Sequence, residues 1–268
     1  MQRPYEIQLG RKQQASQQRF LEVWAYIGDL VPEWWIDHLI ATCAAEVRET
    51  VGGKRAAYAW SGGKDSIALQ LVMEQAGINL CVMGICELEY PAFLQWVTDN
   101  MPWELDVINT GQDLEWLGEH QYMLFPQDAT TAAKWFQQIQ HTAQRRYYRR
   151  YNLDVLILGR RHSDGNYTGK DGSGIYTNKQ DITRYSPIRF WTHEDVLAAA
   201  YYYQRDLPPI YNWPNGFVVG TGAWAARQWT GSIRQGWAEV YSIDPSIVKR
   251  AANFISSAAQ FLVRAGVA

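Results

Sequence analysis

The sequence lacks the features of a membrane or exported protein. It has no run of about 18 or more apolar residues, and its first residues, Met-Gln-Arg-Pro-Tyr, do not form the apolar segment of a signal peptide. Its three cysteines, Cys43, Cys81 and Cys86, are too few and too irregularly spaced for a disulfide framework. We therefore expect a cytoplasmic protein that makes no membrane contact and whose cysteines are buried and structural.

Excess charge is also absent. A formal net charge of -2 argues against a protein that coats nucleic acid through bulk charge. One local basic segment is present on a predicted helix, where arginines alternate with tyrosines: Arg145, Arg146, Tyr147, Tyr148, Arg149, Arg150 and Tyr151. The segment fits either a grip on nucleic acid or a solvated helix face with aromatic core positions, so nucleic acid is an allowed but not a required partner.

Short apolar runs alternate with helical patterns through the middle of the chain. The predicted strands span 55–60, 80–86, 105–109 and 154–158, and helical spacing of apolar residues connects them. This alternation predicts an α/β fold with a doubly wound, mostly parallel sheet. Helical patterns also cover 12–50, 130–151 and 244–265, whereas 162–184 is polar and glycine-rich, which predicts a mobile lid or binding loop.

The segment between the first predicted strand and the next helix carries an anion-binding pattern. It consists of Ser61, Gly62, Gly63, Lys64, Asp65 and Ser66. At the start of a helix, successive backbone N–H groups can surround an oxyanion, and the two glycines let the backbone approach it closely. Lys64 adds positive charge, the serines add hydroxyl donors, and Asp65 can cap the helix or hold Mg²⁺.

The same loop could also be a Walker A motif or a plain glycine turn. A Walker A motif requires Ser or Thr directly after the Gly-Lys pair, but Asp65 stands there, so a P-loop NTPase is disfavoured. The glycines alone could make a tight turn without chemistry, as the triplet at 52–54 illustrates. Serines on both sides of the loop, a strand before it and a helix after it favour the anion-binding interpretation.

A second loop is expected at the same edge of the sheet. Gly159, Arg160 and Arg161 follow the strand at 154–158, and ligands in open α/β sheets bind beyond the carboxyl ends of the strands. Adjacent residues that leave a strand diverge, so we expect one of the two arginines to point into the site.

Four segments in family order resemble the phosphoadenylyl-sulfate (PAPS) reductases of the N-type ATP pyrophosphatase superfamily. They are the loop at 60–66, the segment Glu87-Leu88-Glu89-Tyr90-Pro91, the stretch at 159–163 and the segment 186–196, with its Trp191-Thr192 pair. The resemblance implies a five-stranded sheet of the adenine nucleotide alpha-hydrolase-like fold, with N-terminal and C-terminal helical additions. It also implies a nucleotide-binding role for Glu89, Gly159, Arg160 and Arg161.

The chain departs from this family in its cysteines. No cysteine follows Cys86, so the C-terminal cysteine with which PAPS reductases attack sulfur is missing, and so are the extra cysteines that hold an iron–sulfur cluster in related enzymes.

We expect the chain to have three parts: an N-terminal helical segment (1–50), a nucleotide-binding domain (51–211) and an aromatic-rich C-terminal extension with a helix (212–268).

Three functions fit these observations. The first is an ATP pyrophosphatase that binds ATP with Mg²⁺, adenylylates a substrate and releases pyrophosphate, with Lys64, Asp65 and Arg160 as its catalytic residues. The second is a PAPS reductase that takes its thiol from a partner, and the third is a non-catalytic nucleotide-binding module. The aromatic run from Tyr211 to Trp237 could stack a second substrate or pack on the sheet. The sequence specifies neither that substrate nor the oligomeric state.

Overall fold

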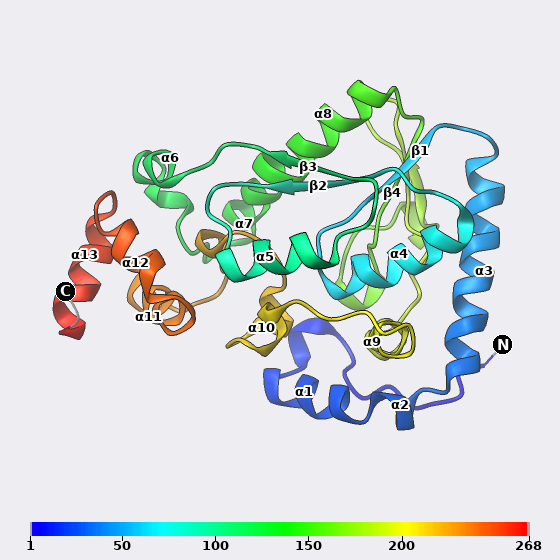
Figure 1. The fold of residues 1–268 in the computed structure, drawn as a ribbon, viewed down its shortest axis with the longest axis horizontal. Helices are drawn as coiled ribbons and strands as arrows, with labels where there is room; N and C mark the ends of the chain where they lie inside the picture. The colour runs from blue at the N-terminus through cyan, green and yellow to red at the C-terminus, as the bar shows by residue number, and fades with distance from the viewer. Residues whose placement is uncertain (1, 267–268) are drawn as a thin grey trace.

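A single sheet organises residues 2–266, which the computed structural model describes (Figure 1). Its strand order is β3-β2-β1-β4-β6-β5, and every neighbouring pair is parallel except β5 with β6. The strands are β1 (Ala56–Ala59), β2 (Cys81–Ile85), β3 (Leu105–Asn109), β4 (Val155–Ile157), β5 (Ile175–Thr177) and β6 (Thr183–Tyr185). The predicted doubly wound α/β class is confirmed, but the sheet has six strands instead of five.

The strands β5 and β6 arise from residues 175–185, which lie almost entirely in the segment that the sequence predicts as a lid or binding loop. Residues 162–184 contain two short 3-10 helices, η4 (His162–Asp164) and η5 (Lys170–Gly172), followed by β5 and the start of β6. Strands of three residues leave almost no periodic signal in a sequence, because alternation needs several residues to show. Their pairing with each other and with β4 supplies the order that the local sequence does not encode.

Helices cover both faces of the sheet (Figure 1). Alternate residues of each strand point to opposite faces, so Tyr58 and Met83 pack in the larger core with α4, whereas Ala57 and Val82 pack against α8. The helices are α1 (Gln17–Ala25), α2 (Ile27–Leu30), α3 (Glu33–Val51), α4 (Lys64–Ala76), α5 (Pro91–Asn100), α6 (Leu114–Glu119), α7 (Ala129–Phe136), α8 (Thr142–Tyr151), α9 (His193–Tyr202), α10 (Gly216–Val219), α11 (Ile233–Ile243), α12 (Pro245–Ala251) and α13 (Ser256–Ala265).

Two predicted helices are interrupted in the structure. The helix expected over 130–151 consists of α7 and α8 joined by a π-helical turn at Gln137–His141. The single terminal helix expected over 244–265 is wrong, because the chain turns between α12 and α13, where buried Ile255 packs into the core. These C-terminal helices lie at the end of the molecule opposite α3 (Figure 1).

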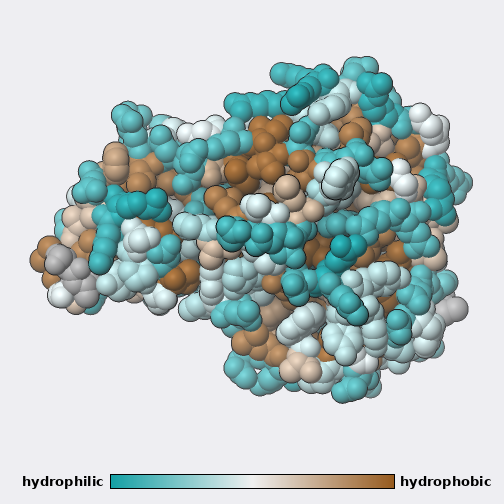
Figure 2. Space-filling model, in the orientation of Figure 1, coloured by the Kyte–Doolittle hydropathy of each residue, from teal (hydrophilic) through white to brown (hydrophobic). Residues whose placement is uncertain are grey.

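The surface seen in the same orientation is largely hydrophilic, with hydrophobic side chains showing between the charged ones (Figure 2). Within residues 2–266 no helix combines the length and the apolar character needed to cross a membrane. Buried residues of the N-terminal segment, the sheet and the C-terminal helices belong to one hydrophobic cluster, as Phe20, Tyr58 and Trp237 illustrate. The division of the chain into three parts stays a prediction.

The N-terminal segment is held to the start of α9 by a buried carboxylate. Glu194 is fully buried, and its Oε1 accepts hydrogen bonds from the backbone N–H groups of Gln8 and Leu9 at 2.8 and 2.7 Å. The Tyr5 hydroxyl donates to the neighbouring Asp195 at 2.6 Å. Asp195 also closes a capping box with Thr192, which fixes the first turn of α9.

We expect Glu194→Ala to lower the free energy of unfolding by about 2–4 kcal/mol, because two buried amides lose a charged acceptor. Glu104→Ala serves as the control, because this exposed glutamate makes no side-chain hydrogen bond or ion pair within residues 2–266. It should change the free energy of unfolding by less than about 0.5 kcal/mol. Denaturant unfolding of both variants measures this. Equal stability of the two variants would contradict the role given to Glu194.

Candidate functional site

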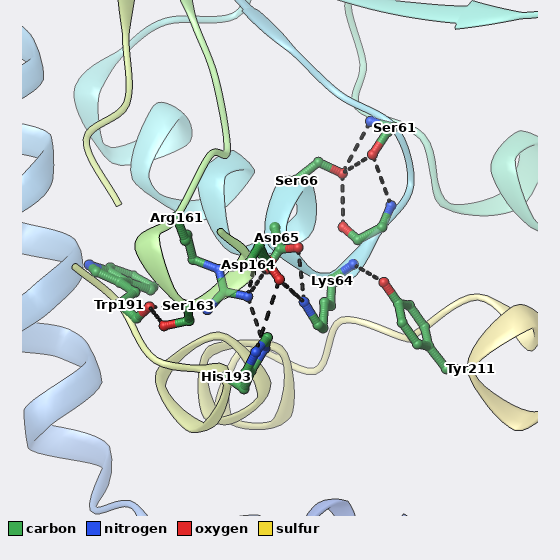
Figure 3. A network of polar contacts seen from close by, with 11 residues as sticks. Ser61, Lys64, Asp65, Ser66, Arg161, Ser163, Asp164, Trp191, His193 and Tyr211 are labelled. Atoms are coloured by element: carbon green, nitrogen blue, oxygen red, sulfur yellow. Dashed lines mark hydrogen bonds and ion pairs between the residues drawn. The ribbon is translucent and has the colours of Figure 1, made fainter. Parts of the chain in front are cut away.

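The Ser61–Ser66 loop connects the carboxyl end of β1 to the first turn of α4 (Figure 3). Gly62 has a φ of +68°, and a Cβ at this position would lie 3.0 Å from Phe93 and 3.1 Å from Trp96. Both the backbone conformation and the packing behind the loop therefore require glycine. Gly159, two residues after β4, also lies close to this loop: a Cβ there would be 3.1 Å from the carbonyl oxygen of Asp65.

Backbone N–H groups of this loop donate to nearby hydroxyl groups. Ser61 N–H donates to Ser66 Oγ at 3.1 Å, and Lys64 N–H donates to the Tyr211 hydroxyl at 2.9 Å. Ser66 Oγ in turn donates to the carbonyl of Gly63 at 2.8 Å. These hydroxyl oxygens mark positions where phosphate oxygens could accept the same hydrogen bonds at the positive end of α4.

Behind the loop lies a buried ionic network that joins the first turn of α4 to the segment that follows β4 (Figure 3). Lys64 Nζ is 2.9 Å from the Asp65 carboxylate, and Arg161 Nε donates to the same carboxylate at 2.7 Å. Arg161 Nη2 is 3.0 Å from Asp164, and Arg161 Nη1 donates to the carbonyl of Trp191. Arg161 and Lys64 are 0% and 1% exposed.

Burial and ion pairing oppose each other in this network. Burial alone would raise the pKa of the Asp65 carboxyl, but Arg161 and Lys64 outweigh it, so the pKa lies well below its usual value. Burial lowers the pKa of Lys64, and Asp65 and Asp164 act against this. The negative charge of Asp65 is thereby fixed between two cations.

His193 completes the network from the first turn of α9. Its Nδ1 accepts a hydrogen bond from Arg161 Nη2 at 3.0 Å, since a guanidinium has only donors. Burial, followed by the charges of Lys64 and Arg161, lowers the pKa of His193 far below its usual value. The neutral ring therefore carries its proton on Nε2. Among residues 2–266 this nitrogen has no hydrogen-bond partner, and it lies 4.0 Å from an Asp164 oxygen that also lacks one there.

The two adjacent arginines point in different directions. Arg161 enters the buried network, whereas Arg160 donates to the carbonyl of Tyr167 at 3.2 Å and to the hydroxyl of Tyr176 at 3.0 Å. Arg160 thus contacts the 162–184 segment and lies outside the ionic network. The catalytic role that we predicted for Arg160 is untested, and Arg161 is the arginine that contacts the loop.

Glu89 lies in a separate pocket beside the loop. Its side chain is 5% exposed, and burial raises its pKa to about 8. Its Oε2 has no hydrogen-bond partner in the described part of the chain. The pocket is lined by residues that follow β2, by α7 with the turn after it, and by the C-terminal extension: Glu89, Ala132, Trp135, Phe136, Ile139, Gln140, Val219, Gly220, Thr221, Gly222, Ala223, Ala226 and Gln228. Thr221 connects it to the loop, since its Oγ1 lies 3.3 Å from the position of a Cβ on Gly63.

Several residues of the site were missed in the sequence. Asp164 lies in the polar segment after Arg161, where nothing distinguishes it from other acidic residues. His193 directly follows a helix cap, and Tyr211 belongs to an aromatic run that fitted core packing equally well. Long-range contacts alone bring these three side chains to the loop.

A metal site made by the protein alone is not present in the part of the chain that the structure describes. No three His, Cys, Asp or Glu side chains gather there in a way that could hold a metal ion. The Mg²⁺ predicted at Asp65 therefore needs oxygens from another molecule, and the Asp65 carboxylate is already paired with Lys64 and Arg161.

The parallel sheet and the loop after β1 define an adenine nucleotide alpha-hydrolase-like fold. The chain matches the family model of the phosphoadenosine phosphosulfate reductase domain over residues 55–218. It therefore belongs to the phosphoadenosine phosphosulfate reductase domain family. No curated protein matches the sequence.

Solved structures are similar to this chain at low sequence identity. A phosphate complex of PAPS reductase from Candida auris matches with a TM-score of 0.50 and 13% identity, over 72% of this chain and 96% of the other. FMN adenylyltransferase from Candida glabrata, in complex with FMN and an ATP analogue, matches with a TM-score of 0.48 and 12% identity, over 72% and 68%. The U34-tRNA thiolase NcsA from Methanococcus maripaludis matches with a TM-score of 0.44 and 14% identity, over 85% and 80%.

We expect Arg161→Lys to weaken ATP binding about tenfold or more, because a lysine cannot reproduce the guanidinium contacts to Asp65, Asp164 and His193. Arg160→Lys removes the same chemical group one residue away and should change the affinity less than about twofold. Calorimetric titration of both variants with ATP measures this, and thermal unfolding reports their stability. Unchanged affinity in both would remove Arg161 from the site.

We expect Glu89→Gln to stabilise the protein increasingly as the pH rises. Between about pH 4.5 and 8 the folded protein binds a proton at Glu89 that the unfolded chain has lost, so the wild type loses stability over this window. Glutamine does not titrate, so the free energy of unfolding of the variant should rise relative to that of the wild type by on the order of 3 kcal/mol between pH 5 and 9. Denaturant unfolding tests this; exposed Glu87→Gln, the control, should show no such trend.

Proposed function

We propose that this chain is an ATP pyrophosphatase that transfers the adenylyl group of ATP to a second substrate. The observation that carries the proposal is the convergence of donors at one end of the sheet: the Ser61–Ser66 loop and Lys64 at the start of α4, with Arg161 and the neutral His193 behind them. Such a set suits a polyphosphate, because it combines oriented amides with fixed positive charge in a buried setting.

In the proposed reaction an oxygen of the second substrate attacks the α-phosphorus of ATP. A new oxygen–phosphorus bond forms, the bond between the α-phosphorus and the bridging oxygen breaks, and pyrophosphate leaves with both bonding electrons. The loop amides and Lys64 stabilise the negative charge of the leaving group. His193 Nε2–H, which has no acceptor within residues 2–266, donates a hydrogen bond to a phosphate oxygen.

Magnesium enters this reaction as part of the substrate, bound to the phosphate oxygens of ATP. Asp65 is the loop carboxylate that would contact it, in exchange for one of its two cationic partners. The ion supplies charge neutralisation to the phosphates. The protein's own residues position the nucleotide, hold its phosphates and exclude water.

The Glu89 pocket is the proposed site for the second substrate. An apolar wall with Trp135 and Phe136 faces a buried carboxyl group whose second oxygen has no partner. A flat or apolar group with an N–H donor or a basic nitrogen fits this lining, because it would satisfy Glu89 in a desolvated setting. Nucleic acid stays an allowed partner.

The family match favours a sulfonucleotide as a second candidate ligand. Reduction of a sulfonucleotide needs a thiolate, and the cysteines of this chain are all buried. Burial raises the pKa of Cys43 to about 11 and that of Cys81 to about 12, and it raises the pKa of Cys86 as well. A reductase built on this chain would therefore take its thiol from a partner.

We expect the purified protein to convert Mg-ATP slowly to AMP and pyrophosphate in equal amounts, with water as the acceptor. Lys64→Ala should lower this rate about a hundredfold, because the leaving group loses its cation. Lys54→Ala is the matched control, since Lys54 is exposed in the similar Gly-Gly-Lys triplet before β1 and should have no effect. Product analysis by anion-exchange chromatography measures both.

Products of ADP and phosphate, or no turnover with any acceptor, would contradict the proposal. Release of sulfite from PAPS in the presence of a thiol protein would identify the reductase instead. Tight ATP binding without turnover would identify a non-catalytic nucleotide-binding module.

A further inference from the structure

A segment outside the family match crosses the candidate site. We call residues 3–17 the N-terminal strap. Before its midpoint the strap is fixed to Glu194 through the N–H groups of Gln8 and Leu9. After its midpoint Gln17 donates to the carbonyl of Tyr211 at 2.5 Å and accepts from Phe217 N–H at 2.8 Å. The strap is thus anchored on both sides to elements that build the site.

Between these two anchors the strap forms the 3-10 helix η1 (Lys12–Gln14), which lies against η4 and α10. Lys12 Nζ lies 3.7 Å from the position of a Cβ on Gly220. Gly220 lines the Glu89 pocket, and its neighbour Thr221 reaches the loop at Gly63. Lys12 therefore stands where the phosphate loop and the second pocket meet.

The charge of Lys12 acts on the buried network. It makes a small contribution to lowering the pKa values of Lys64, Asp65 and His193, after the larger effects of burial and of the charges inside the network. Lys12 is half-buried and forms no ion pair with any residue from 2 to 266. Its charge is available to a ligand.

The charge balance of the network explains why such a cation is needed. Lys64 and Arg161 are positive, Asp65 and Asp164 are negative, and His193 is neutral, so the buried groups cancel. A neutral network offers no net attraction to a polyphosphate that carries several negative charges. With Lys12 added, these six residues carry one net positive charge.

We propose that Lys12 is a binding residue for the phosphate chain of the nucleotide, delivered to the site by the N-terminal strap. The inference rests on the proposed function, because it takes a polyphosphate as the ligand. It assigns a role in the site to a segment that precedes the phosphoadenosine phosphosulfate reductase domain. Lys12 contacts the phosphates directly, and the anchors at Glu194 and Tyr211 hold it in place.

The test compares Lys12→Met, Lys12→Arg and Arg11→Ala by calorimetric titration with ATP, pyrophosphate and adenosine. Lys12→Met removes the charge at similar side-chain length and should weaken ATP and pyrophosphate binding about tenfold, with adenosine binding unchanged. Lys12→Arg should retain most of the affinity. Arg11→Ala removes one positive charge from the neighbouring exposed residue and should change each affinity less than about twofold.

The outcomes separate this inference from the proposed function. Wild-type affinity of Lys12→Met for both ATP and pyrophosphate would overturn the role of Lys12, whatever reaction the enzyme performs. An equal loss in Arg11→Ala would overturn it as well, because bulk charge would then explain the effect. If the wild type binds pyrophosphate through Lys12 but does not bind ATP, the inference stands and the proposed function fails. If it binds neither, both fail.

Discussion

The candidate site depends on one buried guanidinium. Arg161 leaves the end of β4 with no exposed surface and contacts Asp65 from the loop after β1 and Asp164 from η4. A charge at this depth is stable only with such partners, because removing one partner leaves an uncompensated charge at a cost of about 3–5 kcal/mol. The same bonds that satisfy Arg161 therefore fix the Ser61–Ser66 loop relative to the middle of the sheet.

The network also determines the character of the groups around it. Burial and the charges of its two cations lower the pKa of His193, so the ring stays neutral and keeps a proton on Nε2. The carboxylate of Asp65 stays charged and holds Lys64 beside the start of α4. The loop amides meanwhile donate to hydroxyl groups of Ser66 and Tyr211, which a phosphate can replace without leaving any amide unpaired.

Segments outside the sheet complete the site. The N-terminal strap brings Lys12 to Gly220, and the C-terminal extension brings Thr221 to the loop and closes the Glu89 pocket. Lys12 and Thr221 both lie outside residues 55–218, the region of the chain that matches the family model. The family domain thus provides the loop and the ionic network, while the additions shape the space in which a second substrate would lie.

The sequence by itself determined the glycine turn of the Ser61–Ser66 loop with the strand before it and the helix after it. It also determined the alternation that predicts a doubly wound sheet. These features are local: glycine conformation and residue periodicity depend on a few neighbouring residues. Only the tertiary structure decided that Arg161 and not Arg160 enters the network, and that Asp164 and His193 join it. It also decided that Tyr211 contacts the loop and that residues 175–185 add two strands. Those outcomes depend on which distant groups can satisfy a buried charge or a free strand edge, and no local pattern carries that information.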